Sequence, residues 1–291
     1  MTTNADVCIA LTFDFDALST WIGTFRATSP SMLSRGEFGP IGAERVLDLL
    51  DEFDIPATFF TPGHTAVAYP SMVKKMHAAG HEIAHHGWVH ENPTGVTKEE
   101  ELAVLRHGTA ELRRVTGEDP RGYRSPAWDN SPNTVSLLLA EGFEYESSLM
   151  GNDFEPYWCR LNDVPSPTEP YRFGRPVPLV EIPVSWYMDD WVHFEYVNSA
   201  YGLLQGQKPP SAVLEIWKSE LDFLCMQPDG GLLTITMHPQ VIGRGHRLMM
   251  LRNFIQYSRE VSNPRFVRCL DYAREWRQGR LPALPRHAAQ P

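Results

Sequence analysis

Acidic and imidazole side chains with the spacing of a metal site lie in the first third of the chain. Asp14 and Asp16 are separated by one residue, and His86 and His90 are four positions apart. A divalent cation relieves the repulsion between neighbouring carboxylates, and one carboxylate with two imidazoles leaves coordination positions for water and substrate. The pattern therefore predicts one divalent ion held by Asp16, His86 and His90, and the chemistry of a metal-dependent hydrolase.

The histidine spacing needs its context, because the chain contains 11 histidines. On a helical turn, residues four positions apart share a face, so we expect His86 and His90 to meet one ion. The alternative is a pair of surface histidines near a helix start, and the neighbouring carboxylates favour the metal site. His81 and His85 flank the preceding strand, and we expect His81 to be structural and His85 to support the site.

Two later segments carry groups suited to catalysis. Arg124 is a permanent cation that can pair with Asp14 and orient it, and Trp128 on the same loop can form a pocket wall. His238 follows an apolar run and can serve as a general acid, because its pKa lies near working pH. The alternatives are a surface ion pair for Arg124, core packing for Trp128 and a structural role for His238.

An aromatic and acidic run at 185–191 follows a proline-rich segment at 153–178. We expect the prolines to prevent regular structure, so that this segment is a long loop over one end of the fold. Trp186 and Trp191 are candidate substrate-binding residues, and the alternative is a lid packed on the barrel. If both segments cover the barrel mouth, a closed pocket would favour small amides over long glycans.

Strand-like and helix-like runs alternate, as expected for β/α units around a parallel sheet. About seven units favour closure into a barrel, which would place the candidate residues on loops after the carboxyl ends of the strands. We expect one domain over 1–280, a glycine-rich loop around 36–39 and a loosely ordered tail over 281–291. Strands are expected at 8–13, 57–60, 82–84, 123–124, 143–145, 179–184 and 232–236, and the main helices at 43–53, 71–79, 98–115, 133–140, 212–226 and 247–260.

Composition excludes several classes of function. The net charge is −10, so the chain lacks the surplus of basic residues that a general nucleic-acid binder needs. No apolar run approaches the roughly 20 residues of a membrane span, and the N-terminal segment lacks the basic region of a signal peptide, so we expect a cytoplasmic protein. The four scattered cysteines are expected to be reduced thiols. They are Cys8, Cys159, Cys225 and Cys269.

These motifs resemble those of the polysaccharide deacetylases of the NodB-homology kind, the carbohydrate esterase 4 group. They occur in the same order as in that family and extend over nearly the whole chain. The run TFDFD at 12–16 is similar to the first motif of that family. The family motif H-[ST]-x-x-H appears at 86–90 with Gly87 in place of Ser or Thr. Arg124 and Trp128 correspond to a third motif, and His238 to the closing histidine.

The resemblance implies a distorted (β/α)7 barrel of the NodB-homology type and hydrolysis of carbon–nitrogen bonds other than peptide bonds. In the first motif of the family one acid serves as base and the next binds metal, which implies Asp14 as the base and Asp16 as the ligand. We expect zinc as the metal. Cobalt, nickel or iron stay as alternatives, because the supply of metals in the cell, and not ligand type alone, decides which ion occupies the site.

The separated aspartates, Gly87, the loop 34–39 and the cluster 186–191 resemble a branch with peptidoglycan deacetylase-like proteins, cyclic imide hydrolases and allantoinase-like proteins. The branch implies a homo-oligomer, commonly a tetramer. Two substrate classes stay open, an N-acetylated sugar or related small N-acyl compound and a cyclic imide or ureide. The alternative from another class is a non-catalytic carbohydrate-binding relative.

Overall fold

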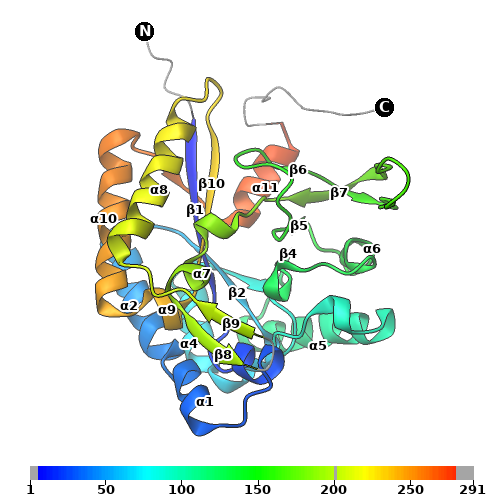
Figure 1. Ribbon diagram of the computed structural model, residues 1–291, viewed down its shortest axis with the longest axis horizontal. Helices are drawn as coiled ribbons and strands as arrows, with labels where there is room; N and C mark the ends of the chain where they lie inside the picture. The colour runs from blue at the N-terminus through cyan, green and yellow to red at the C-terminus, as the bar shows by residue number, and fades with distance from the viewer. Residues whose placement is uncertain (1–5, 200–201, 280–291) are drawn as a thin grey trace.

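A curled parallel sheet forms the frame of the molecule (Figure 1). The computed structural model describes residues 6–199 and 202–279. Within these ranges the parallel strands follow the order β10-β1-β2-β3-β4-β5-β7, with β6 antiparallel at the edge and β11 beside β1. The strands are β1 (Val7–Asp14), β2 (Thr58–Thr61), β3 (Glu82–His85), β4 (Gly122–Tyr123), β5 (Tyr145–Glu146), β6 (Tyr157–Leu161), β7 (Arg175–Glu181), β10 (Gly231–Met237) and β11 (Arg265–Phe266), with β8 (Tyr196–Ser199) and β9 (Gly202–Gln205) forming a separate hairpin.

Helices connect the strands and cover the outside of the sheet (Figure 1). Alternation along β1 explains this layering: Ile9, Leu11 and Phe13 pack in one apolar cluster with side chains of the outer helices, whereas Cys8 and Ala10 pack with residues of α11 in another. The helices are α1 (Pro30–Glu37), α2 (Gly39–Glu52), α3 (Gly63–Ala68), α4 (Pro70–Ala78), α5 (Lys98–Thr116), α6 (Thr134–Ala140), α7 (Asp190–Phe194), α8 (Pro210–Cys225), α9 (Pro239–Ile242), α10 (Gly245–Val261) and α11 (Cys269–Arg277).

The sheet curls into an incomplete barrel. The first and last of its parallel strands, β10 and β7, do not pair with each other in the sheet of the described residues. An isolated parallel bridge between Asp189 and Thr236 joins the segment after β7 to β10. The expected distorted (β/α)7 barrel is therefore confirmed, with its distortion at this junction.

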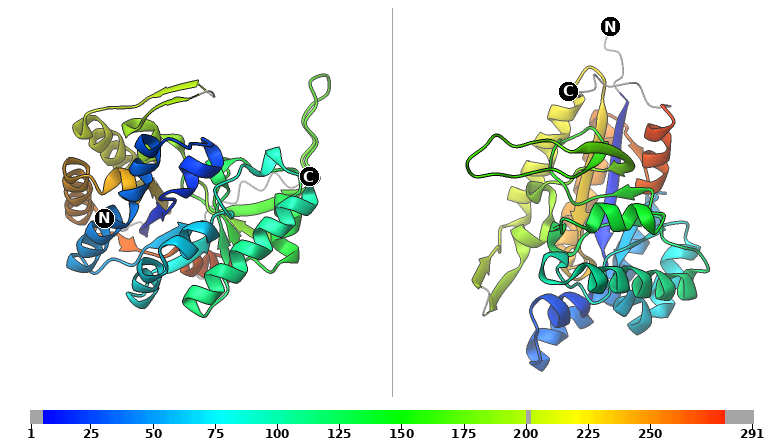
Figure 2. Two further views of the ribbon diagram at one scale, coloured as in Figure 1. Left: turned by 90° about the horizontal axis from the view of Figure 1, so that it is seen from below. Right: turned by 90° about the vertical axis from the view of Figure 1, so that its right-hand side faces the viewer.

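The proline-rich segment 153–178 differs from expectation, because it contains regular structure. It includes β6 and the beginning of β7, which pair as an antiparallel hairpin. Pro176 and Pro178 alternate with Val177 and Leu179, so that the prolines are exposed and the aliphatic side chains are buried. Proline is tolerated in a strand at a sheet edge or bulge, and this pairing contains a register shift. The loop joining the two strands projects away from the body instead of covering one end of the barrel (Figure 2).

A helix also replaces the glycine-rich loop expected at 36–39. Gly36 lies in α1 and Gly39 begins α2. Their small size matters because a Cβ at Gly36 would lie 2.6 Å from the Ala17 carbonyl oxygen, and one at Gly39 would lie 2.8 Å from the Ala17 Cβ. Both glycines therefore allow the α1–α2 junction to approach the loop that follows β1.

The remaining expectations concern the ends of the chain and its thiols. The tail expected at 281–291 lies outside the described residues, and a single domain over 1–280 stays a prediction. No helix among the described residues is long and apolar enough to cross a membrane. All four cysteines are free thiols, as expected; Cys225 is partly exposed and the other three are buried.

Candidate active site

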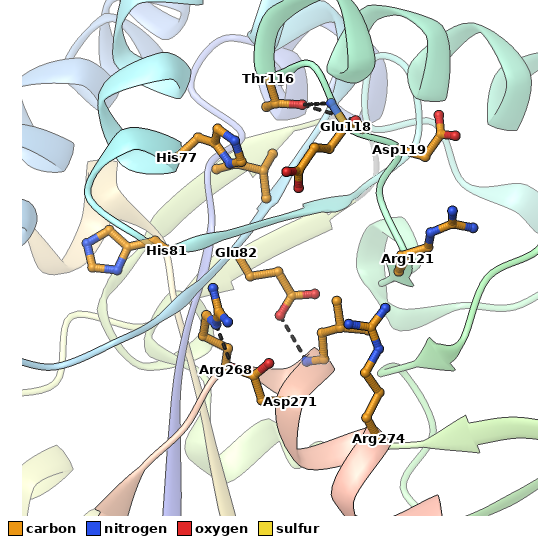
Figure 3. A pocket seen from close by; sticks show the side chains of 12 residues that line it. His77, His81, Glu82, Thr116, Glu118, Asp119, Arg121, Arg268, Asp271 and Arg274 are labelled. Carbon is orange, nitrogen blue, oxygen red and sulfur yellow. Dashed lines mark hydrogen bonds and ion pairs between the residues drawn. The ribbon is translucent and has the colours of Figure 1, made fainter.

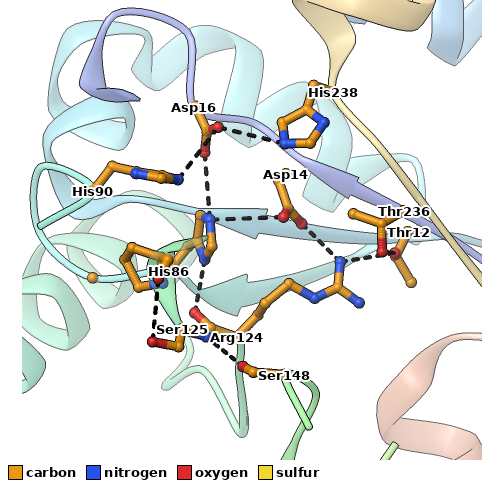
Figure 4. A network of polar contacts seen from close by, with 12 residues as sticks. Thr12, Asp14, Asp16, His86, His90, Arg124, Ser125, Ser148, Thr236 and His238 are labelled. Atoms are coloured by element: carbon orange, nitrogen blue, oxygen red, sulfur yellow. Dashed lines mark hydrogen bonds and ion pairs between the residues drawn. The ribbon is translucent and has the colours of Figure 1, made fainter. Parts of the chain in front are cut away.

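Polar side chains from four strands meet at the carboxyl end of the sheet (Figure 4). Asp14 is the last residue of β1, and Asp16 follows on the next loop. His86 comes directly after β3, Arg124 after β4 and His238 after β10. Since parallel strands end at the same edge, residues up to 224 positions apart in the sequence are brought together here.

Asp16 lies at the centre of this cluster. Its Oδ1 is 3.5 Å from His86 Nε2, and its Oδ2 is 3.7 Å from His90 Nε2 and 3.8 Å from His238 Nε2. His86 Nε2 is also 3.7 Å from Asp14 Oδ2. All five side chains are buried. These separations exceed ordinary hydrogen-bond lengths, so the atoms surround a small space without bonding one another directly.

The unsatisfied atoms around this space fit a cation. Both carboxylate oxygens of Asp16 and Nε2 of His86 are buried without a hydrogen-bond partner. Burial raises the pKa of Asp16 well above its usual value, and the neighbouring Asp14 charge acts in the same direction although His238 opposes both. A bound cation would remove this penalty. One oxygen and two imidazole ligands, from Asp16, His86 and His90, suit a divalent ion with open coordination positions.

Hydrogen bonds behind the rings hold the two candidate histidine ligands in the metal-binding form. His86 Nδ1 lies 2.7 Å from the carbonyl oxygen of Arg124, which can only accept, so Nδ1 carries the proton and Nε2 keeps its lone pair. His90 Nδ1 lies 2.6 Å from the Thr24 hydroxyl. Burial lowers the pKa of His86, and it lowers that of His90 further, so both rings are neutral near pH 7. Neutral imidazole is the form that binds metal.

The histidine pair lies on a loop, and the expected helical turn is wrong. Gly87 and His90 have φ angles of +73° and +63°, which an α-helix excludes. The His85 Nδ1 accepts a hydrogen bond of 3.1 Å from the Gly87 N–H, and its Nε2 lies 3.1 Å from the Leu105 carbonyl oxygen, to which it donates. Burial lowers the pKa of His85 to about 3. A neutral, buried His85 therefore supports the loop that presents His86 and His90.

Arg124 is fully buried and pairs with Asp14, as the sequence predicts. Its Nη1 lies 2.8 Å from Asp14 Oδ1 and 2.9 Å from the Thr12 hydroxyl. Its Nε and Nη2 donate to the carbonyl and hydroxyl oxygens of Ser147, each at 3.0 Å. Burial raises the pKa of Asp14, but the charge of Arg124 and the hydrogen bond that Arg124 donates oppose this effect, and that pKa stays below its ordinary value. Asp14 is thus an ionised carboxylate with a fixed orientation.

His238 is paired with an acid that sequence reasoning did not assign to it. Its Nδ1 lies 2.7 Å from Asp190 Oδ1, and its backbone N–H donates to the same carboxylate. Burial lowers the pKa of His238, yet the hydrogen bond to Asp190 and the charges of Asp189 and Asp16 raise it to about 10. Asp190 stands in the aromatic run 185–191. That run was the available signal, but nothing in it specifies a partner 48 residues away.

The three candidate tryptophans lie beside these polar groups. Trp128 is 7% exposed and stacks on Trp186 with ring centroids 4.3 Å apart, and the Arg124 guanidinium is 6.0 Å from the Trp128 ring centroid. Trp191 lies 5.2 Å from the His238 ring. Trp186 is 41% exposed, so it offers an accessible aromatic face next to the buried cluster. Trp128 and Trp191 therefore lie next to the catalytic candidates Arg124 and His238, and Trp186 stacks on Trp128.

A separate polar cavity of about 430 Å³ lies near Glu82, at the amino end of β3 (Figure 3). His81 lines it and accepts a hydrogen bond of 3.2 Å from the Ala57 N–H, in keeping with the structural role expected for it. Arg268 also lines the cavity, but it is paired with Asp271 at 2.6 Å. None of the predicted site residues lines this cavity.

Comparisons with known proteins identify similar chains and folds. The family model for polysaccharide deacetylases matches residues 2–145. The peptidoglycan deacetylase of Helicobacter pylori is 33% identical over 274 residues, which cover 90% of this chain and 93% of that protein. A Mycobacterium smegmatis structure described as a polysaccharide deacetylase has a TM-score of 0.84 and 34% identity, and the match covers 100% of this chain and 96% of that one. Puue allantoinase has a TM-score of 0.77 and 26% identity, covering 96% and 92%.

Proposed function

The chain belongs to the polysaccharide deacetylase family, and we propose that it is a metal-dependent deacetylase that removes acetyl groups from an N-acetylated sugar of a glycan. Its reaction class is hydrolysis of a carbon–nitrogen bond other than a peptide bond. The observation that carries the proposal is the convergence of unpaired Asp16 and His86 atoms with an ionised Asp14 and a protonated His238.

Asp16, His86 and His90 would hold the ion, which we propose to be zinc. When bound, a divalent ion supplies Lewis-acid polarisation of the amide carbonyl and lowers the pKa of water. Support comes from the unsatisfied oxygens of Asp16 and from the neutral imidazoles. Cobalt, nickel or iron would also suit these donors.

Asp14 would accept the proton of the attacking water. Its Oδ1 is held by Arg124, and its Oδ2 is 3.7 Å from His86 Nε2, on the side of the metal ligands. Because its pKa is below the usual value, the carboxylate is ionised and ready to act as a base at neutral pH. Arg124 is buried and bonded on several sides, so it also fixes the position of that base.

His238 would protonate the departing nitrogen. The Asp190 carboxylate accepts a hydrogen bond from Nδ1 of His238. The other ring nitrogen, Nε2, lies on the side of Asp16 and is the one that would donate its proton. A pKa of about 10 keeps the ring protonated at neutral pH. General acid catalysis of this kind contributes about 10²- to 10⁴-fold to the rate.

The glycan substrate is supported by relatives and by surface chemistry. The Helicobacter pylori relative that matches over most of both chains is a peptidoglycan deacetylase. Trp186 and Tyr187 are 41% and 71% exposed, and their apolar faces can pack against a sugar ring. The projecting β6–β7 hairpin removes one reason for expecting a closed pocket, and with it one reason to favour small amides over long glycans.

A small cyclic imide or ureide is the second candidate substrate, favoured by the 26% identity to Puue allantoinase. Ring opening would use the same base, acid and metal ligands. A non-catalytic carbohydrate-binding role is the candidate from another class. The presence of both the ligand set and the acid–base pair argues against this role. A homo-oligomer, with a tetramer as the expected form, is also part of the proposal and can be tested by light scattering.

Substrate assays of the zinc-loaded protein would test the proposed function. N-acetylglucosamine oligomers of increasing length and soluble peptidoglycan fragments would be compared with succinimide, hydantoin and allantoin. We expect release of acetate from the glycans, and a rate about 10²- to 10⁴-fold lower with Asp14→Asn. Ring opening without acetate release would favour the second candidate, and saturable sugar binding without hydrolysis would favour the non-catalytic role.

A further inference from the structure

Thr24 makes two hydrogen bonds to the candidate ligand His90. Its hydroxyl lies 2.6 Å from His90 Nδ1 and 2.8 Å from the carbonyl oxygen of the same residue. Thr24 is the last residue of a π-helical turn, η1 (Thr20–Thr24), on the loop that follows β1. π-Helical turns are rare and occur often at functional sites. The hydroxyl therefore connects the loop after β1 to the loop after β3.

The two bonds together fix where the proton of His90 lies. A hydroxyl has one proton, and the carbonyl oxygen of His90 can only accept, so Thr24 donates to that carbonyl. The hydroxyl oxygen is then the acceptor for His90, which must carry its proton on Nδ1. Nε2 is left with its lone pair on the side of Asp16 Oδ2, 3.7 Å away.

The backbone around this contact is also close-packed. A Cβ at Gly23 would overlap the carbonyl oxygen of Val89, so only glycine lets the η1 turn approach the histidine loop. His90 itself has a φ of +63°, a left-handed conformation that is strained for a non-glycine residue. The bond from Thr24 to the His90 carbonyl acts on this strained residue directly.

The family motif has Ser or Thr at the position directly after His86, but in this chain that position cannot provide a hydroxyl to His90. That position is Gly87, whose φ is +73° and whose added Cβ would lie 3.0 Å from Pro126 Cγ. The hydroxyl on His90 comes instead from a residue 66 positions earlier in the chain.

We propose that Thr24 is a positioning residue that orients His90 and fixes its tautomer for metal binding. The inference rests on the proposed function, because it assumes that His90 is a metal ligand. Outer partners of ligating histidines set ring orientation and basicity, and their loss typically weakens metal affinity about 10- to 100-fold. Thr24 needs no contact with substrate to have this effect.

Metal affinity in three variants tests the inference. Zn²⁺ dissociation constants would be measured by competition with a chromophoric chelator for wild type, Thr24→Val and Thr24→Ser. Thr24→Val keeps the shape but removes the hydroxyl, and we expect it to weaken zinc binding about 10- to 100-fold. Thr24→Ser keeps the hydroxyl and should bind zinc like wild type. Thr20→Val, in the same turn, is the matched control and should also retain wild-type affinity.

The absorption spectrum of bound Co²⁺ provides a second readout, because it reports ligand geometry. Thr24→Val should change this spectrum, and Thr24→Ser should not. Melting temperatures of the metal-free proteins verify folding, and Thr24→Ala replaces Thr24→Val if valine is not accommodated. Equal zinc affinity of wild type and the hydroxyl-free variant would overturn the inference. Absence of metal binding by wild type would instead overturn the proposed function.

Discussion

The Arg124 guanidinium and the Asp14 carboxylate form an ion pair of 2.8 Å in which both side chains are almost completely buried. Arg124 also donates to Thr12, which lies on the same strand as Asp14, and to Ser147, which follows β5, so the cation is held from two different strands. The position of the proposed base therefore depends on a residue that comes from a different β/α unit.

Replacing Arg124 should affect both stability and pH dependence. Arg124→Gln leaves Asp14 without its buried partner, which should destabilise the protein by about 3–5 kcal/mol. Because the Arg124 charge lowers the pKa of Asp14, its loss raises that pKa, and the acid limb of the kcat profile should move to higher pH. Urea denaturation and a pH–rate profile measure the two effects. An unchanged acid limb in a folded variant would contradict the pairing of base and cation.

The two aspartates should have separable roles. Asp14→Asn should keep the metal and lose activity by about 10²- to 10⁴-fold, because the base is lost while the ligand set is complete. Asp16→Asn should lose metal affinity, because its oxygens are the unsatisfied ligand atoms. Zinc content and acetate release would be measured on the same preparations. Reversed phenotypes would mean that base and ligand have been exchanged.

Asp190 should control the alkaline limb of the reaction. Its hydrogen bond raises the pKa of His238, so Asp190→Asn should lower that pKa and move the alkaline limb of kcat to lower pH. Asp189→Asn removes a charge but not the hydrogen bond to His238, so it serves as the matched control with a smaller shift. Two variants with the same profile as wild type would argue against His238 as the acid.

The exposed Trp186 should affect substrate binding and not metal binding. Trp186 stacks on Trp128 and is 41% exposed, so Trp186→Ala removes an accessible aromatic surface. We expect KM for glycan oligomers to rise while zinc content stays unchanged. Phe223 is an exposed aromatic residue on α8, and Phe223→Ala serves as the control, which should leave KM unaltered. A loss of zinc in Trp186→Ala would show that the ring supports the metal site instead.

Sequence patterns were sufficient for the elements that are regular and for the residues at strand ends. Apolar runs predict β1 and β10, and their carboxyl ends carry Asp14 and His238. The helix expected at 98–115 is likewise present as α5, and its acidic first turn and its last turn with Arg113 and Arg114 suit the helix dipole. These features depend on local sequence, which explains why they could be predicted.

Contacts between distant loops could not be predicted in the same way. His86 and His90 meet through left-handed loop residues, although their spacing indicates a helical turn. Thr24 and Asp190 act on histidines 66 and 48 positions away, and no local pattern specifies such pairs. The prolines near 176 suggested an irregular loop, but burial of alternate aliphatic residues produces a strand there. In each case tertiary packing overrides the local signal.

Above all, we propose that Asp16, His86 and His90 hold one divalent ion. Elemental analysis of purified wild type, His86→Ala and His90→Ala, each dialysed against the same zinc buffer, tests it most directly. We expect about one zinc per chain in wild type and none in either variant. Far-ultraviolet circular dichroism should be unchanged, because the ligands lie on loops at the end of the sheet. Zinc retained at wild-type stoichiometry in both folded variants would contradict it.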